Sequence, residues 1–210
     1  MADSGYILKA DALELLIKIR SQDSIDVTGG DKPDEAAVGK YYRTSTGNYI
    51  ACLLDIVHFD TNPWPVLIEY TANGDIAATH DIDGGMYLCC WDDFGFYKKD
   101  NYYIVKSCGT GSGYCSSEIH LFKDLQTMNS GSIMQTAWSA WCRAPGLACS
   151  LTSKMDIRSD TILMHYKLEI LKPTRKDYKL KKTELFDIAY IDRNDEWMAV
   201  DTVNLDKLPY

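Results

Sequence analysis

The chain has 210 residues, of which 46% are hydrophobic and 25% are charged, so it is long enough to bury a sizeable core. Its net charge of −8 disfavours non-specific binding to nucleic acid, because that binding requires Lys and Arg side chains to neutralise phosphates. No segment reaches the roughly 18 consecutive apolar residues of a membrane-spanning helix, and the N-terminal segment lacks the basic and apolar regions of a signal peptide.

Residues 7–20 predict an amphipathic helix, because apolar side chains recur at three- and four-residue spacing between charged ones. We expect its apolar stripe to pack against the rest of the protein. The stripe consists of Leu8, Leu15, Leu16 and Ile19. The polar residues 21–39 that follow contain Gly-Gly and Pro, and this composition predicts a linker.

From residue 40 onward, short alternating segments separated by turn residues predict antiparallel strands. The clearest hairpin is "WPVLIEYTANGDIAATHDID", in which Asn73-Gly74 predicts a type I′ turn. Two further meanders follow Ser150, with a hairpin tip at Pro173. We therefore predict a mainly β chain, an antiparallel sandwich or open barrel of meanders and hairpins with an N-terminal α-helix. Residues 1–39 form the helix and linker, and residues 40–210 form a single β domain.

Four of the seven cysteines lie close together, in "MYLCCWDDFGF" and "SCGTGSGYC". A structural zinc site favours two cysteines separated by two to four residues, and neither of these segments has that spacing. Adjacent residues on a strand also point to opposite faces, so Cys89 and Cys90 do not suit one metal ion. A catalytic thiol needs an activating base, and no pattern links any of the four histidines to a cysteine.

Disulfides suit these cysteines better, because cysteines clustered near turns in a tyrosine-rich β chain are typical of exported domains. The candidate disulfide cysteines are Cys89, Cys90, Cys108, Cys115, Cys142 and Cys149. The last two flank a Pro-Gly loop and are expected to pair, while each of the adjacent two is expected to pair with one of the middle two. Cys52 lies in an apolar run and is the candidate buried thiol. The alternative is that all seven cysteines are reduced and buried.

Three short motifs lack the residues of the sites that they resemble. "DIDGG" lacks the third ligand and the distal Glu of a calcium-binding loop. "WDDF" places two carboxylates side by side, whereas a glycosidase needs them on separate walls of a cleft. "GTGSG" lacks the following helix and Lys of a phosphate-binding loop. We therefore assign no catalytic, metal-binding or cofactor-binding residue, and we predict that the protein is not an enzyme and needs no cofactor.

The aromatic residues near the cysteines are the candidate binding surface. Rings bind sugars or peptide side chains well, because they offer a large contact area at a low entropic cost. Core packing is the alternative role for each ring. The candidates are Trp91, Phe94, Phe96, Tyr97, Tyr114, Trp138 and Trp141.

The segments "GMYLCCWDDFGFY", "SCGTGSGYCSSEIHLF", "LTSKMDIRSDTILMHYKLE" and "NDEWMAVD" resemble exported proteins and lipoproteins of Bacteroidota envelopes. The resemblance implies a periplasmic or outer-membrane-associated location, and it supplies no active site. It also implies an N-terminal lipid anchor on a cysteine, and this sequence lacks that cysteine. The lipid anchor is the only membrane attachment that the resemblance implies.

We therefore expect a non-enzymatic cell-envelope lipoprotein that binds a protein partner, as an accessory subunit of an outer-membrane assembly. One alternative is a periplasmic immunity or inhibitor protein whose acidic surface opposes a basic toxin. A second alternative is a glycan-binding module. Nucleic acid is not an expected partner.

Overall fold

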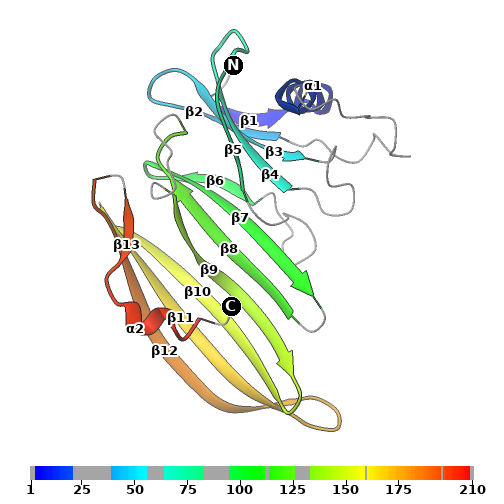
Figure 1. The fold of residues 1–210 in the computed structure, drawn as a ribbon, viewed down its shortest axis with the longest axis vertical. Coiled ribbons are helices and arrows are strands. Elements are labelled where there is room, and N and C mark those ends of the chain that lie inside the picture. The colour runs from blue at the N-terminus through cyan, green and yellow to red at the C-terminus, as the bar shows by residue number, and fades with distance from the viewer. Residues whose placement is uncertain are drawn as a thin grey trace. The chain divides into compact units, whose positions relative to one another are not determined.

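A computed structural model describes most of the chain in two open antiparallel sheets. The described residues are 3–20, 39–55, 64–82, 95–111, 114–125, 133–158, 160–194 and 196–208. The first sheet has five strands in the order β1-β2-β3-β4-β5, and the second has eight in the order β13-β12-β11-β10-β9-β8-β7-β6 (Figure 1). This arrangement confirms the mainly β prediction and fits a sandwich.

The chain divides into two compact units, and the predicted domain bounds of 1–39 and 40–210 stay a prediction. One unit comprises Met1–Ser107 and Phe122–Met128, and the other comprises Cys108–Leu121 and Asn129–Tyr210. The N-terminal helix belongs to the first unit. The division falls within strands β7 and β8, so no linker in the sequence marks it.

The first unit contains the five-stranded sheet, the helix α1 and the start of the second sheet. Its elements are β1 (Ser4–Ile7), α1 (Lys9–Arg20), β2 (Gly39–Arg43), β3 (Tyr49–Asp55), β4 (Trp64–Tyr70), β5 (Ile76–Asp81), β6 (Phe96–Lys99) and β7 (Tyr102–Gly111). Strand β1 was not predicted, because its four residues are too short to show an alternation.

Both faces of the five-stranded sheet are buried, so successive residues of β4 enter different clusters. Val66 and Ile68 lie in a cluster with α1, whereas Leu67 lies in a cluster with Phe96 and Val105. This burial on both faces explains why β4 reads as a nearly continuous apolar run. The side-chain alternation predicted for β4 is therefore confirmed.

Helix α1 packs against the first face, as its apolar stripe predicts. Leu16 is fully buried, and Leu15 and Ile19 pack against the same cluster. Leu8 is 74% exposed, so its inclusion in the buried stripe was wrong. The reason is its position, because Leu8 precedes the first residue of the helix and does not share its helical spacing.

The β2–β3 and β4–β5 hairpins use the same turn. In each, a Thr carbonyl accepts from the amide of a Gly three residues later, as Thr71 does from Gly74. Only the glycine has a positive φ, +91° at Gly47 and +84° at Gly74. The type I′ turn predicted at Asn73-Gly74 is wrong, because that turn requires positive φ at both central residues. A left-handed glycine after a type I turn fits instead.

The second unit consists of long antiparallel strands that bend along their length, and a short terminal helix (Figure 1). Its elements are β8 (Tyr114–Phe122), β9 (Met134–Ala144), β10 (Leu147–Arg158), β11 (Thr161–Pro173), β12 (Tyr178–Asp192), β13 (Trp197–Ala199) and α2 (Thr202–Leu205). Strands β11 and β12 meet at residues 174–177, which confirms the hairpin tip predicted at Pro173.

One face of the second unit's sheet forms its core. Ile162, Met164 and Tyr166 alternate along β11 and are all buried. They lie beside Phe186, Ile188 and Tyr190 of β12, with which they pair in register. We call the face that carries these residues the inner face, and the opposite face the outer face.

Candidate binding surface

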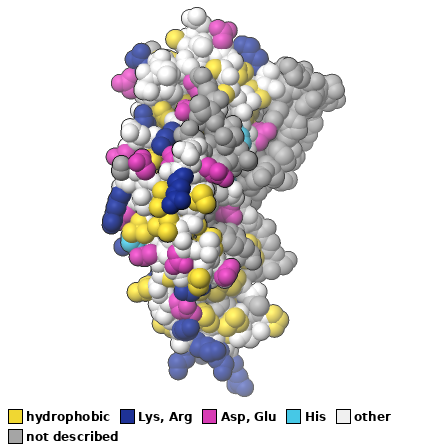
Figure 2. All heavy atoms as spheres, turned by 60° about the vertical axis from the view of Figure 1, so that its left-hand side comes forward, with side chains coloured by type: hydrophobic (Ala, Val, Ile, Leu, Met, Phe, Trp, Pro, Cys, Tyr) yellow, Lys and Arg dark blue, Asp and Glu magenta, His cyan; other side chains and the backbone are white. Residues whose placement is uncertain are grey.

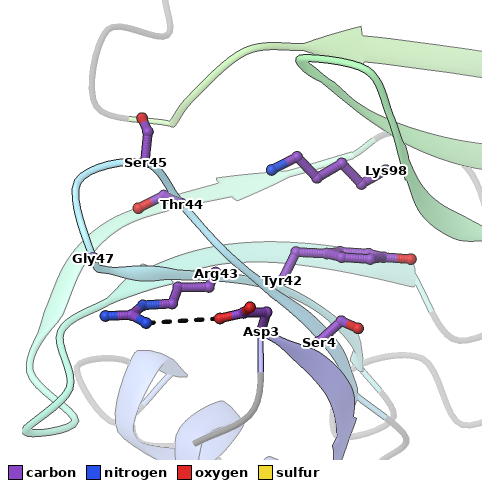
Figure 3. A pocket seen from close by; sticks show the side chains of 8 residues that line it. All are labelled: Asp3, Ser4, Tyr42, Arg43, Thr44, Ser45, Gly47 and Lys98. Carbon is purple, nitrogen blue, oxygen red and sulfur yellow. Dashed lines mark ion pairs between the residues drawn. The ribbon is translucent and has the colours of Figure 1, made fainter.

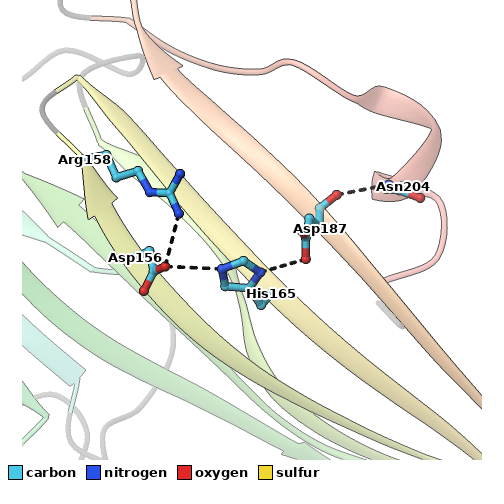
Figure 4. Close-up of polar contacts among 5 residues, drawn as sticks. All are labelled: Asp156, Arg158, His165, Asp187 and Asn204. Atoms are coloured by element: carbon cyan, nitrogen blue, oxygen red, sulfur yellow. Dashed lines mark hydrogen bonds and ion pairs between the residues drawn. The ribbon is translucent and has the colours of Figure 1, made fainter.

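A polar cluster lies on the outer face of the second unit, where strands β10, β11 and β12 pair. His165 stands directly opposite Asp187 in the β11–β12 register. Asp156 of β10 stands opposite Leu163, two residues from His165 and therefore on the same face. Figure 4 shows the imidazole lying between the two carboxylates, with Arg158 beside Asp156.

Both ring nitrogens of His165 contact a carboxylate. Nδ1 lies 2.8 Å from Oδ1 of Asp187, and Nε2 lies 3.4 Å from Oδ2 of Asp156. The hydrogen bond to Asp187 raises the pKa of His165, partial desolvation opposes this effect, and the contact with Asp156 raises the pKa further. Arg158 completes the cluster, with Nη2 3.6 Å from Oδ2 of Asp156.

This cluster does not have the geometry of a general base. A histidine that accepts a proton from a substrate must direct one ring nitrogen at it, and both nitrogens of His165 are directed at Asp156 and Asp187. Within the described residues, no group of three or more His, Cys, Asp or Glu side chains is arranged to hold a metal ion. The cluster therefore suits an electrostatic or recognition role.

Exposed apolar side chains lie on β12, on β13, directly after β13 and on α2. We call this set the outer patch, and it consists of Leu185, Met198, Val200 and Val203, which are 76%, 50%, 60% and 71% exposed. Met198 pairs with Ile191, so it continues the outer face of β12 onto β13. In Figure 2, hydrophobic side chains on this side of the molecule are interspersed with acidic ones. Apolar patches rimmed by polar groups are typical of protein interaction surfaces.

Helix α2 is held beside the outer patch by side-chain hydrogen bonds. Asp201 caps its first turn by accepting from the Val203 amide at 3.1 Å. Nδ2 of Asn204 donates to the carbonyl oxygen of Asp187 at 3.0 Å (Figure 4). This bond satisfies a backbone carbonyl of β12 and holds α2 against that strand.

A separate polar pocket of about 550 Å³ lies in the first unit, at the turn between β2 and β3. Its lining residues are Asp3, Ser4, Tyr42, Arg43, Thr44, Ser45, Gly47 and Lys98. Nη1 of Arg43 lies 3.6 Å from Oδ1 of Asp3, and Figure 3 shows the Lys98 side chain extending toward Ser45. Two basic side chains and one carboxylate leave the lining with one net positive charge, which suits a small hydroxylated anion.

One predicted disulfide is present, and the other predicted pairs lie partly outside the described residues. Cys142 and Cys149 stand opposite each other in the β9–β10 register and are bonded. Cys108 is buried and Cys115 is partly buried. Cys89 and Cys90 lie outside the described residues, so their pairing stays a prediction. Cys52 is fully buried, as predicted, and burial raises the pKa of its thiol.

The candidate aromatic residues do not form one surface in the described part of the chain. Trp91 and Phe94 lie outside the described residues. Phe96 is fully buried between the sheets of the first unit, so its assignment to a binding surface is corrected to core packing. Tyr97 is partly exposed, and its ring lies 5.6 Å from Nζ of Lys106.

The remaining candidate rings lie on strands of the second unit. Trp138 and Trp141 both belong to β9. The Trp141 ring meets the Tyr178 ring edge-on at 5.2 Å and so anchors the turn end of the β11–β12 hairpin. Tyr114 is partly exposed and stands opposite Cys142.

The His165 cluster was not predicted, because no sequence motif links His165 to Asp156 or Asp187. Asp156 lies 9 residues before His165 in the sequence, and Asp187 lies 22 residues after it. The registers of the β10–β11 and β11–β12 hairpins bring the three residues together. The alternation of β11 places His165 on the polar face, but nothing in the sequence states which residue of β12 stands opposite.

Comparisons with known proteins identify no family for this chain. No protein-family model matches the sequence, and comparisons with curated proteins and with solved structures found no significant match. Neither helix in the described part of the chain is long and apolar enough to cross a membrane.

Proposed function

We propose that the protein is a non-enzymatic cell-envelope protein that binds a partner protein through the outer patch. The observation that carries this proposal is the exposure of Leu185, Met198, Val200 and Val203 on β12, the strand that carries Asp187, and on the segment that pairs with it. Desolvating four apolar side chains on one face supplies binding energy, and the charged groups beside them supply orientation and specificity. The partner surface that fits is apolar with charged groups of both signs, since His165 and Arg158 accompany Asp156 and Asp187 on the outer face.

Two further observations support a binding role in the envelope. The Cys142–Cys149 disulfide fits an oxidising compartment, where such bonds persist. The His165 cluster engages both ring nitrogens with carboxylates, which suits recognition better than proton transfer. An accessory subunit and an immunity protein both fit this surface. They differ in the partner, which is a membrane assembly in one case and a basic toxin in the other.

The test is affinity capture from native membranes with a patch variant and a matched control. Leu185→Asp with Met198→Asp places two charges in the outer patch, and Tyr6→Asp with Leu147→Asp places two charges at exposed apolar positions elsewhere. We expect wild type and control to capture the same protein, which then binds the purified chain directly. The patch variant should bind it at least tenfold more weakly, the loss of about 1.4 kcal/mol.

Equal capture by the patch variant, or no specific protein captured by the wild type, would contradict the proposal. Circular dichroism of each variant checks that it is folded, since substitutions at exposed positions usually change stability little.

Glycan binding is a second candidate function, favoured by the polar pocket of the first unit. Its hydroxyl groups on Ser4, Thr44 and Ser45 and its basic Lys98 suit an acidic sugar. We expect glucuronate to shift the NMR signals of the pocket residues more than glucose does, and Lys98→Met to remove this preference. Identical shifts with both sugars, or none with either, would exclude this role.

A further inference from the structure

The hairpin between β11 and β12 concentrates positive charge in an acidic protein. Residues 172–182 contain six Lys or Arg and one acidic residue, Asp177, so this segment carries a net charge of +5. The whole chain carries −8, and the remainder therefore carries −13. Figure 2 shows the Lys and Arg side chains gathered at the lower end of the molecule as drawn.

The hairpin tip extends beyond the neighbouring strand. Pairing between β10 and β11 ends at Ala148 and Leu171, whereas β11 and β12 stay paired as far as Pro173 and Tyr178. Tyr178, in the last pair before the turn, meets the Trp141 ring edge-on, and this contact holds the extension against the sheet. The basic segment is therefore a projecting element of defined position.

Most of the positive charge on the hairpin has no acidic counterpart nearby. In the part of the chain that the structure describes, Lys182 is the one basic residue of this segment with an ion pair, at 2.7 Å from Glu184. Lys172 and Lys179 stand directly opposite each other across the two strands. Like charges in directly opposed positions destabilise a hairpin, and a bound anion would relieve that repulsion.

Protection of an open sheet edge explains only part of this charge. Lysines on an edge strand prevent unwanted strand pairing, and this reason covers Lys179, Lys181 and Lys182 on β12. It does not cover Lys172 on β11, or Arg175 and Lys176 in the turn. The hairpin also exposes 52% of Leu180, an apolar side chain among the lysines.

We propose that this hairpin docks the protein onto an anionic phospholipid bilayer. Clusters of four to eight Lys or Arg bind the phosphate-bearing head groups of such membranes, and an exposed Leu180 adds apolar contact at the interface. The hairpin carries a net charge of +5 at one end of the second unit's sheet, so a flat anionic surface can contact the tip alone.

Nucleic acid is the weaker alternative occupant. Binding to single strands uses aromatic rings as stacking platforms, and Tyr178, the one aromatic residue of the segment, already packs against Trp141. The bilayer contact is separate from the outer patch and does not depend on the proposed function.

The test is co-sedimentation of the full chain with vesicles of phosphatidylcholine, with and without about one-third phosphatidylglycerol. The hairpin variant is Lys172→Glu with Lys179→Glu. It reverses the charge at these two positions, which lowers the net charge of residues 172–182 from +5 to +1, and it keeps a like-charged pair across the strands. The matched control is Lys154→Glu with Arg193→Glu, which changes the net charge equally at exposed positions outside the hairpin. Near-ultraviolet circular dichroism and the melting temperature confirm that each variant is folded.

We expect the wild type and the control to bind the anionic vesicles at least about tenfold more tightly than the neutral ones, and the hairpin variant to lose that preference. Binding should weaken as salt rises, because the ions screen the attraction. Leu180→Ser should weaken binding about threefold at constant charge, through lost apolar contact.

Three results would overturn the proposal. The first is the absence of a preference for anionic vesicles at low salt. The second is an equal preference in the folded hairpin variant. The third is tighter binding to duplex DNA or to polyglutamate than to the vesicles, since either ligand would assign the hairpin to another class of partner.

Discussion

Nδ1 of His165 lies 2.8 Å from Oδ1 of Asp187, at directly opposed positions on β11 and β12. A neutral imidazole can donate one hydrogen bond, but the protonated ring can donate to Asp187 and Asp156 together. The pair of carboxylates therefore favours the charged form, and the pKa of His165 lies above its ordinary value. Protonation of this one side chain is thereby linked to the stability of three paired strands.

The stability contributed by His165 should depend on pH. Because its folded pKa is raised above the unfolded value of 6.5, the contribution is fully present below that pH and is lost as pH rises through the folded pKa. Denaturant unfolding of wild type and His165→Gln should therefore differ more at about pH 5.5 than at about pH 8.5.

NMR titration of His165 provides the direct check. The variant Asp187→Asn should lower its pKa toward 6.5, because the main hydrogen bond to a charged acceptor is removed. A stability difference that stays constant across this pH range would show that the charge on His165 does not contribute.

Leu16 and Leu8 form a matched pair for testing whether α1 is part of the core. Leu16 is fully buried and Leu8 is 74% exposed. Leu16→Ala should cost about 3 kcal/mol of the free energy of unfolding, because it removes apolar burial and leaves a cavity. Leu8→Ala should change it by less than about 0.5 kcal/mol. Equal effects in urea denaturation would mean that the helix does not dock on the sheet in solution.

Thr136 joins two tyrosines on the inner face of the second unit. Its Oγ1 lies 2.8 Å from the Tyr166 hydroxyl and 2.6 Å from the Tyr190 hydroxyl, and all three side chains are buried. Thr136→Val keeps the shape but removes the bridging oxygen, so it should destabilise by about 1 to 3 kcal/mol. Thr152→Val, at an exposed position of β10, is the control. A loss no larger than that of the control would mean that water replaces the bridge.

The Cys142–Cys149 disulfide closes a short hairpin, with a sequence separation of 7. Replacing both residues by Ala should lower the free energy of unfolding, because the unfolded chain then gains conformations that the bond had excluded. The expected loss is only about 2 kcal/mol, because the loop that the bond closes is short. Mass spectrometry with and without a reductant checks that the bond exists in protein from an oxidising compartment. Two alkylated thiols at these positions without reductant would contradict the structure.

Much of the strand layout was predictable, because alternation and turn residues are local properties of the sequence. Ile162, Met164 and Tyr166 alternate with polar neighbours along β11, and the turn after this strand lies at the predicted position. The Cys142–Cys149 bond was also predictable, because the two cysteines flank one tight Pro-Gly turn. The type I′ turn at Asn73-Gly74 was not, since the same two residues also fit a type I turn with a left-handed glycine.

The sequence by itself determined the strands, most of their turns and the face on which each side chain of β11 lies, because these depend on a two-residue period and on local backbone preferences. Only the tertiary structure decided which strands pair and in what register. Register brings His165 opposite Asp187, and long-range packing buries Phe96 and sets Trp141 against Tyr178. These contacts join residues far apart in the chain, so their energies depend on the whole fold and leave no mark in a local pattern.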